Sequence, residues 1–226
     1  MGSAVSATAE GKTRRTQQAR SEEARGRLLA AAIELICEQG FARTTLADVA
    51  ARAGFTRGAI QHHFAGREEL ALEIIHSVEA QILASFDALS PGSELDVGAR
   101  IDHLIDTLGA ISRGRPYLAV VDIWLATRAS AQLEGEVRQS MLRSSASFKR
   151  LWLRIFTGDV PAPVIADCRR VVVTLMRGVV VSQALISNGR AIEQTLETAK
   201  QMVRRHMLSA MVTDAAGSAA QFSHPG

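Results

Sequence analysis

Residues 45–64 read TLADVAARAGFTRGAIQHHF and predict two short helices joined by a tight turn. Thr45 is a favoured N-cap residue, and Asp48 three positions later can complete a capping box. Gly54 tolerates the left-handed backbone conformation that ends many helices. Thr56 is placed to cap the second helix, which is expected to run through the rest of the stretch. The segment therefore predicts a helix-turn-helix.

The second helix of this segment has a narrow apolar side and a wide polar side. Ile60 and Phe64 share its inward face. The positions left to face outward are Arg57, Gly58, Ala59, Gln61, His62 and His63. Such a helix is shaped to enter the major groove of DNA, while the preceding helix crosses the phosphate backbone. From spacing alone, a surface helical hairpin is an equally good interpretation.

The residues on both sides of the segment extend the pattern. Gly40-Phe41 precedes it and Arg67-Glu68-Glu69-Leu70 follows it, and together with TTLADVAARAGFTRGAIQHHF they resemble the DNA-binding signature of TetR-family transcriptional regulators. The resemblance covers about the first third of the chain. It implies DNA contacts from a set of nine residues, with Arg67 on a phosphate: Thr45, Thr56, Arg57, Gly58, Ala59, Gln61, His62, His63 and Arg67.

Three positions depart from the family pattern: Ala47 and Ala59 replace residues that are often polar in these regulators, and Gln61 is the third. Gln61 stands where these regulators usually have tyrosine. Because glutamine can bond bidentately to adenine, DNA binding is retained, but the sequence preference cannot be copied from relatives.

The composition favours an all-helical protein. The chain has 226 residues, of which 47% are apolar and 4% aromatic, with five prolines and few β-branched alternations. A chain of this length can bury a substantial core. Helices are expected at about 22–39, 67–86, 96–112, 116–129, 131–156, 161–187 and 191–212. The predicted fold class is all-α, with an N-terminal three-helix DNA-binding domain and a C-terminal helical ligand-binding and dimerisation domain.

Domain boundaries follow from the helices and from the composition of the ends. We expect a disordered arm over 1–21, the DNA-binding domain over 22–82, the ligand-binding and dimerisation domain over 83–213, and a disordered tail over 214–226. The arm lacks the apolar stretch of a secretion signal.

A cytoplasmic protein is expected from two further features. The longest apolar run, 171–187, is interrupted by Arg177, Ser182 and Gln183, so it predicts a buried helix and no membrane span. Cys37 and Cys168 both lie in apolar helical patterns, which predicts buried thiols rather than a disulfide, as in a reducing cytoplasm.

Positive charge is concentrated in the N-terminal third. Residues 12–67 hold ten Lys/Arg against five Asp/Glu, whereas residues 68–226 hold sixteen against seventeen. The excess lies in the segment that contains the predicted helix-turn-helix, as attraction to DNA phosphates requires. Taken alone, a basic segment indicates no more than a solvated face.

The second domain combines bulky apolar side chains with a few polar groups, which is typical of a small-molecule site. Ordinary core packing is the more frequent role for each of these residues. Arg128 or His103 is placed to bind a polar or anionic end of a ligand. The predicted pocket residues are His103, Trp124, Arg128, Met141, Phe148, Trp152 and Met176.

Catalytic and metal-binding motifs are absent from the sequence. There is no G-x-S-x-G, no glycine-rich phosphate loop, no H-E-x-x-H and no cysteine pair at ligand spacing. The adjacent His62 and His63 diverge by about 100° on a helix, so they cannot share a metal. No catalytic residue, metal or cofactor is predicted.

The last two helices predict a homodimer. Helix 161–187 is apolar nearly all round, and the next helix has one apolar stripe, formed by Ile192, Leu196, Ala199, Val203, Met207 and Ala210. Two such helices from each copy would form a four-helix interface, as in relatives of this family. Two-fold symmetry would then present two reading helices to a palindromic operator in double-stranded DNA.

The whole chain thus predicts a ligand-responsive transcriptional repressor that a small apolar or aromatic effector releases from its operator. Two alternatives remain at this stage. One is a helical small-molecule binding protein that no longer reads DNA, and the other is an enzyme that uses the apolar cavity.

Overall fold

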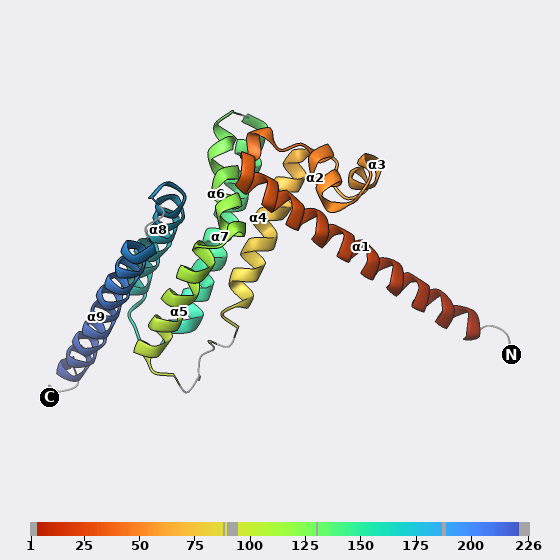
Figure 1. The fold of residues 1–226 in the computed structure, drawn as a ribbon. Helices are drawn as coiled ribbons and strands as arrows, with labels where there is room; N and C mark the ends of the chain where they lie inside the picture. Colours follow the sequence, from red (N-terminus) through yellow and green to blue (C-terminus); the bar gives the residue numbers. More distant parts are fainter. Residues whose placement is uncertain (1–3, 88, 90–94, 130, 187–188, 222–226) are drawn as a thin grey trace. The chain divides into compact units, whose positions relative to one another are not determined.

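The computed structural model describes residues 4–87, 89, 95–129, 131–186 and 189–221. Within that part of the chain it contains nine α-helices and two short 3-10 helices and no strand (Figure 1), so the predicted all-α class is confirmed. The chain divides into two compact units, Met1–Ile74 and Ile75–Gly226. This division lies inside the helix predicted to link the domains, earlier than the expected boundary at residue 82.

The first unit holds α1 (Ala4–Gln39), η1 (Phe41–Arg43), α2 (Leu46–Ala53), α3 (Arg57–Gln61) and the start of α4 (Arg67–Ala84). α1 begins at Ala4 and not near residue 22, so most of the segment expected to be disordered is helical. The physical reason is its content of Ala, Gln, Arg, Glu and Lys, which are strong helix formers, without any proline.

The core of the first unit draws on every helix. Its central side chains are at most 2% exposed: Leu28, Ala32, Ile36, Phe41, Val49, Ala50, Ile60, Phe64, Leu70, Ala71 and Ile74. α1 contacts α2, and its buried Leu28, Ala32 and Ile36 belong to the same core as Val49, Ile60 and Phe64. The Arg25 guanidinium covers the Phe64 ring at 4.9 Å and forms a 2.9 Å ion pair with Glu73 of α4. α1 and α4 together hold the inward side of the helix-turn-helix.

The second unit holds the rest of α4, then α5 (Val97–Ser112), α6 (Arg115–Ala126), η2 (Thr127–Ala129), α7 (Ala131–Phe156), α8 (Ala162–Ile186) and α9 (Gly189–Gln221). α9 continues to Gln221, although 214–226 was expected to be disordered. Its end is rich in alanine and free of proline, which allows the helix to continue. The predicted breaks at 90–93 and at residue 188, and the last five residues, lie outside the described part.

The apolar stripe of α9 packs inside its own chain. Ile192, Leu196, Val203 and Met207 are at most 9% exposed, and α9 contacts α5 and α8, its neighbours in Figure 1. Lys200 and Arg204 of α9 pair with Asp106 and Asp102 of α5 at 2.7 and 2.8 Å. The prediction that this stripe forms the dimer interface is therefore wrong, because α5 and α8 of the same chain already cover it.

α8 carries the longest apolar run of the chain and buries one side of it. Val172, Met176 and Val179 are at most 4% exposed. None of the described helices combines the length and apolarity needed to cross a membrane. Cys168 on this helix is a buried thiol, and burial is the main cause that raises its pKa to about 11. Cys37 is half-buried, not fully buried as expected.

Candidate functional site

The ends of α2 and α3 are set by the caps that the sequence predicts. Thr45 Oγ1 accepts a hydrogen bond from the Asp48 N–H at 3.2 Å, and the Asp48 carboxylate accepts from the Thr45 N–H at 3.3 Å. Gly54 ends α2 with φ 75°. Thr56 Oγ1 accepts from the Ala59 N–H at 3.2 Å. These bonds fix where the first helix stops and the second begins.

Gly54 and Gly26 make a matched pair for testing this turn. A Cβ at Gly54 would face a positive φ, which costs about 1–2 kcal/mol. Gly26 lies within α1 with no atom within 4 Å of an added Cβ. Gly54→Ala should lower the free energy of unfolding by about 1–2 kcal/mol, and Gly26→Ala should raise it by about 0.5–1 kcal/mol. Urea titration of both variants measures this; a neutral Gly54→Ala would contradict the assigned turn.

α3 exposes polar side chains, while apolar side chains in and just after it are buried in the core. It ends at Gln61, earlier than expected, because the His62 and His63 N–H groups close the last turn on the Ala59 and Ile60 carbonyls. Ile60 and Phe64 are 0% exposed. Of the predicted DNA-contacting residues on and beside this helix, the exposed ones are Thr56, Arg57, Gly58, Gln61 and His62, and the half-buried ones are Ala59 and His63.

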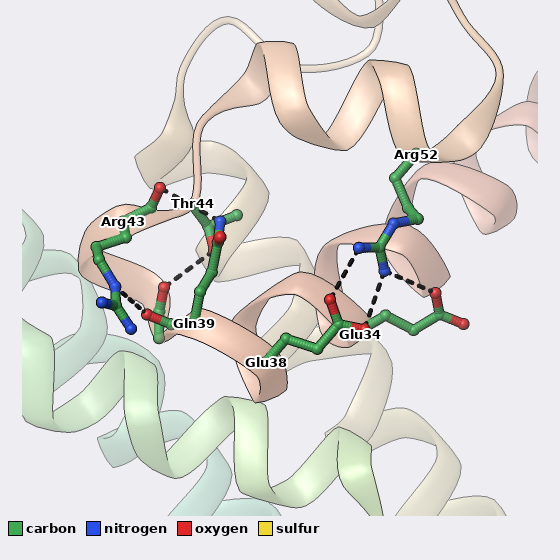
Figure 2. Close-up of polar contacts among 7 residues, drawn as sticks. Glu34, Glu38, Gln39, Arg43, Thr44 and Arg52 are labelled. Carbon is green, nitrogen blue, oxygen red and sulfur yellow. Dashed lines mark hydrogen bonds and ion pairs between the residues drawn. The ribbon is translucent and has the colours of Figure 1, made fainter.

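Two arginines hold the end of α2 against α1. Figure 2 shows the Arg52 guanidinium on Glu38, with bonds of 3.1 and 2.8 Å, and on Glu34 at 3.4 Å. Arg27 Nη2 donates to the Ala53 carbonyl at 2.8 Å. In the sequence, Arg27 and Arg52 are part of the positive charge attributed to DNA binding. The sequence does not show that carboxylates and a backbone carbonyl lie next to them in the folded protein. Their contacts orient the helix-turn-helix.

Two residues of the predicted DNA-contacting set already have partners. The Thr45 hydroxyl donates to Asp48 Oδ2 at 2.7 Å, and the Thr45 N–H donates to the same carboxylate. Thr45 thus has no donor left for a phosphate, and we assign it to capping. Arg67 Nη1 donates to the Ala42 carbonyl at 3.1 Å, and its guanidinium lies 4.8 Å from the Phe41 ring. Arg67 has four further N–H donors, so its phosphate contact stays a prediction.

A cavity of about 90 Å³ lies in the second unit, with walls from α4, α5, α6, α7 and α8. Four of the predicted pocket residues line it: Trp124, Met141, Phe148 and Met176. Tyr117 also lines it, with its ring edge-on to Trp124 at 6.2 Å. Most of the wall is apolar.

The other three predicted pocket residues lie elsewhere. Trp152 is 1% exposed and packs on Phe156, with ring centroids 5.7 Å apart. His103 is exposed on α5, and Arg128 is exposed in η2. Sequence spacing placed them on apolar faces, but the tertiary packing makes Trp152 part of the core and leaves the other two at the surface.

Trp152→Ala should therefore act on stability rather than on ligand binding. Removing a fully buried tryptophan leaves a cavity and costs about 3–5 kcal/mol. The expected result is a large drop in the midpoint of urea unfolding, followed by circular dichroism. Phe148→Ala is the comparison, since Phe148 is half-buried and lines the cavity. A Trp152→Ala protein as stable as the wild type would contradict this placement.

The cavity also has polar groups that sequence reasoning missed. Glu79 Oε2 accepts from Ser144 Oγ at 2.5 Å. Arg177 lies with its guanidinium 5.2 Å from the Trp124 ring centroid, and Arg169 lines the wall beyond it. The sequence did contain a signal for Arg169 and Arg177. They lie on the same face of α8 as Val173 and Met176, and Met176 was already a predicted pocket residue.

Comparison with known proteins bears on the first unit above all. The profile described as bacterial regulatory proteins of the tetR family matches residues 28–74, which contain the helix-turn-helix and its caps. The chain is 28% identical over 146 residues to the HTH-type transcriptional regulator CymR of Pseudomonas putida, covering 63% of this chain and 70% of CymR. It is 43% identical over 65 residues to TtgR of the same species, covering 29% and 30%.

Residues 28–74 thus form a domain of the tetR family of bacterial regulatory proteins. Among solved structures, the chain is similar to NalD of Pseudomonas aeruginosa, described as the secondary repressor of the MexAB-OprM multidrug efflux pump. The TM-score is 0.60 at 19% identity, covering 82% of this chain and 98% of NalD, which shows the shared fold. The chain spans 70%, 40% and 30% of three curated relatives, so the ligand must be argued from its own residues.

Proposed function

We propose that this TetR-family chain is a ligand-responsive repressor that binds palindromic duplex DNA as a homodimer and leaves it when a small molecule fills the cavity. The observation that carries the proposal is α3 with the turn after it, where Ile60 and Phe64 are fully buried while Arg57 and Gln61 are exposed. The regulators named CymR and TtgR and the repressor NalD support this function over that of a binding protein that does not read DNA.

Base reading is assigned to the two long polar side chains of α3. Arginine pairs bidentately with guanine, and glutamine pairs bidentately with adenine. Arg57 and Gln61 are four residues apart, so they project from the same side of the helix. Phosphate or sugar contacts are assigned to Thr56, His62, His63 and Arg67, whereas Gly58 and Ala59 are small enough to let the backbone approach DNA.

The dimer is assigned to the outer faces of α8 and α9. Val171, Val181 and Leu185 of α8 are 60%, 41% and 77% exposed, and they lie within one arc of about 80° of the helix. On α9, Met202 and Val212 are 67% and 72% exposed, outside the buried stripe. An exposed apolar surface of this kind is typical of an interface between proteins.

The switch is assigned to α4. Its first residues belong to the unit that contains α3, and Ile75, Val78, Glu79 and Ile82 further along it line the cavity. A ligand touching these residues can bias the spacing of the two reading helices, which must both fit successive major grooves. To move a 1:99 equilibrium to 99:1, it must bind the released state about 5.5 kcal/mol more tightly.

Fluorescence anisotropy with DNA from upstream of its own gene tests the function. The expected result is tight binding to this duplex, with affinity that falls steeply as salt rises, and much weaker binding to a scrambled duplex. Equal affinity for the two duplexes would overturn the proposed function.

A further inference from the structure

Two hydrogen-bond donors in the cavity wall are buried without an acceptor. Nε1 of Trp124 and Nε of Arg169 have no partner among the described residues. A buried donor that stays unpaired destabilises the protein, and the effect is larger when the group is charged. An oxygen atom of a ligand would relieve this penalty.

The charges around the cavity also favour an acceptor. Its wall includes two guanidinium groups, Arg169 and Arg177, and one carboxylate, Glu79. The Glu79 carboxylate accepts a hydrogen bond from Ser144 Oγ at 2.5 Å. The wall therefore has an excess of positive charge, which attracts an anion. Because Arg177 is exposed and Arg169 is half-buried, water screens less of this attraction at Arg169 than at Arg177.

Tyr117 adds a neutral donor to this set and no negative charge. Burial is the main cause that raises the pKa of its phenol above the ordinary value, although the nearby Arg177 opposes the shift. The hydroxyl is accordingly protonated at neutral pH, so it does not offset the two guanidinium groups.

The rest of the cavity suits a compact ring. Trp124, Met141, Phe148 and Met176 provide flat and adaptable apolar contacts. The volume of about 90 Å³ is smaller than the ~150 Å³ cavity that admits benzene in another protein, so a ring must widen the cavity when it binds. Arg169 and Arg177 are eight residues apart, about 12 Å along α8, so a single-ring ligand reaches one of them.

We propose that the effector is an apolar ring bearing one carboxylate, with the carboxylate bound to the guanidinium of Arg169 and the ring packed beside Trp124 and Phe148. This rests on the proposed ligand response. Arg169 is the chosen anchor because its Nε is buried without an acceptor, whereas the Arg177 guanidinium is stacked over the Trp124 ring. Charge-assisted bonds of this kind are roughly twice as strong as neutral ones.

The test uses the full chain and probes that differ in charge at similar shape. Benzoate and cyclohexanecarboxylate are the acids, benzamide is the neutral counterpart, and benzylamine is the cation. Binding is followed by tryptophan fluorescence and by the shift in thermal midpoint. We expect benzoate to bind at least about 10-fold more tightly than benzamide, the gain expected from one charge-assisted hydrogen bond.

Three variants locate the anchor. Arg169→Gln should bring the benzoate-to-benzamide affinity ratio to about one. Arg170→Gln is the matched control, since Arg170 is the next residue of α8, is exposed, and pairs with Asp167 outside the cavity wall. It should leave the ratio unchanged. Because the ratio compares two ligands on one protein, a loss of stability in a variant does not mimic the effect. If Arg177→Gln abolishes the ratio and Arg169→Gln does not, the Arg169 assignment is wrong.

Operator binding separates this proposal from the proposed function. Without ligand, the wild type and the Arg169→Gln and Arg170→Gln variants should bind operator DNA alike, and benzoate should release the wild type and the Arg170→Gln variant. Preference for benzamide or benzylamine, or no binding of any probe, would overturn the carboxylate proposal. If ligand-free protein fails to bind operator, the proposed function itself is wrong.

Discussion

Replacing Arg57 and Gln61 together by alanine is expected to abolish preference for the operator while leaving weak binding to any duplex. Each good bidentate contact contributes about 1–3 kcal/mol of discrimination. In a two-fold dimer each substitution acts in both half-sites, so Arg57→Ala alone should cost about 2–6 kcal/mol. Both side chains are exposed on α3, and Ile60 and Phe64 beneath them stay in place, so the fold should survive.

The measurement is anisotropy on operator and scrambled duplexes at several salt concentrations. The double variant should bind both duplexes with the same affinity and with nearly the salt dependence of the wild type, because charge contacts to phosphates largely remain. Arg67→Lys is the comparison that alters a phosphate contact while retaining charge, and it should weaken binding to both duplexes alike. Unchanged operator preference in the Arg57/Gln61 variant would show that other residues read the bases.

Aspartate at both Val181 and Leu185 is expected to give a folded monomer that has lost most of its affinity for the operator. These side chains are 41% and 77% exposed, so a charge there does not disturb the core of the protomer. It does place four carboxylates in the apolar interface of a two-fold dimer, where they would repel each other without partners. A monomer contacts one half-site, and loss of the second contact should weaken binding about 10²–10⁴-fold.

Sedimentation equilibrium and circular dichroism check this result together. Leu142→Asp is the matched control, because Leu142 is 67% exposed and belongs to α7, which is not part of the proposed interface. It should remain dimeric and bind operator normally. A dimer that persists in the Val181/Leu185 variant would place the interface elsewhere. Val203→Asp is unsuitable for this purpose, since Val203 is 5% exposed and its substitution would unfold the protomer.

Local signals in the sequence were sufficient for the helix-turn-helix. The capping box of Thr45 and Asp48, the positive φ of Gly54 and the cap at Thr56 all depend on residues three or four positions apart. Such bonds form or fail within one turn of chain, so the sequence contains all the information they need. The spacing of Ile60 and Phe64 likewise predicted that both are buried, although α3 ends before Phe64.

Where the partners of a side chain are distant in sequence, only the tertiary structure shows which residues it contacts. An apolar stripe shows that a helix has a face to cover, but not what covers it. The α9 stripe was thus assigned to a second copy, whereas α5 and α8 of the same chain bury it.

The lining of the cavity and the partners of Arg52 were likewise decided by contacts between residues distant in sequence. Trp152 and Phe148 occupy similar positions on α7, yet one packs in the core and the other lines the cavity. The sequence alone suggests that the positive charge of Arg52 attracts DNA. In the folded protein, Arg52 forms an ion pair with Glu38 of α1. The sequence by itself determined the all-helical class and the caps of α2 and α3, because short-range hydrogen bonds and spacing specify them. The partners of each buried or charged side chain were decided by tertiary packing, because those contacts exist only once distant helices meet.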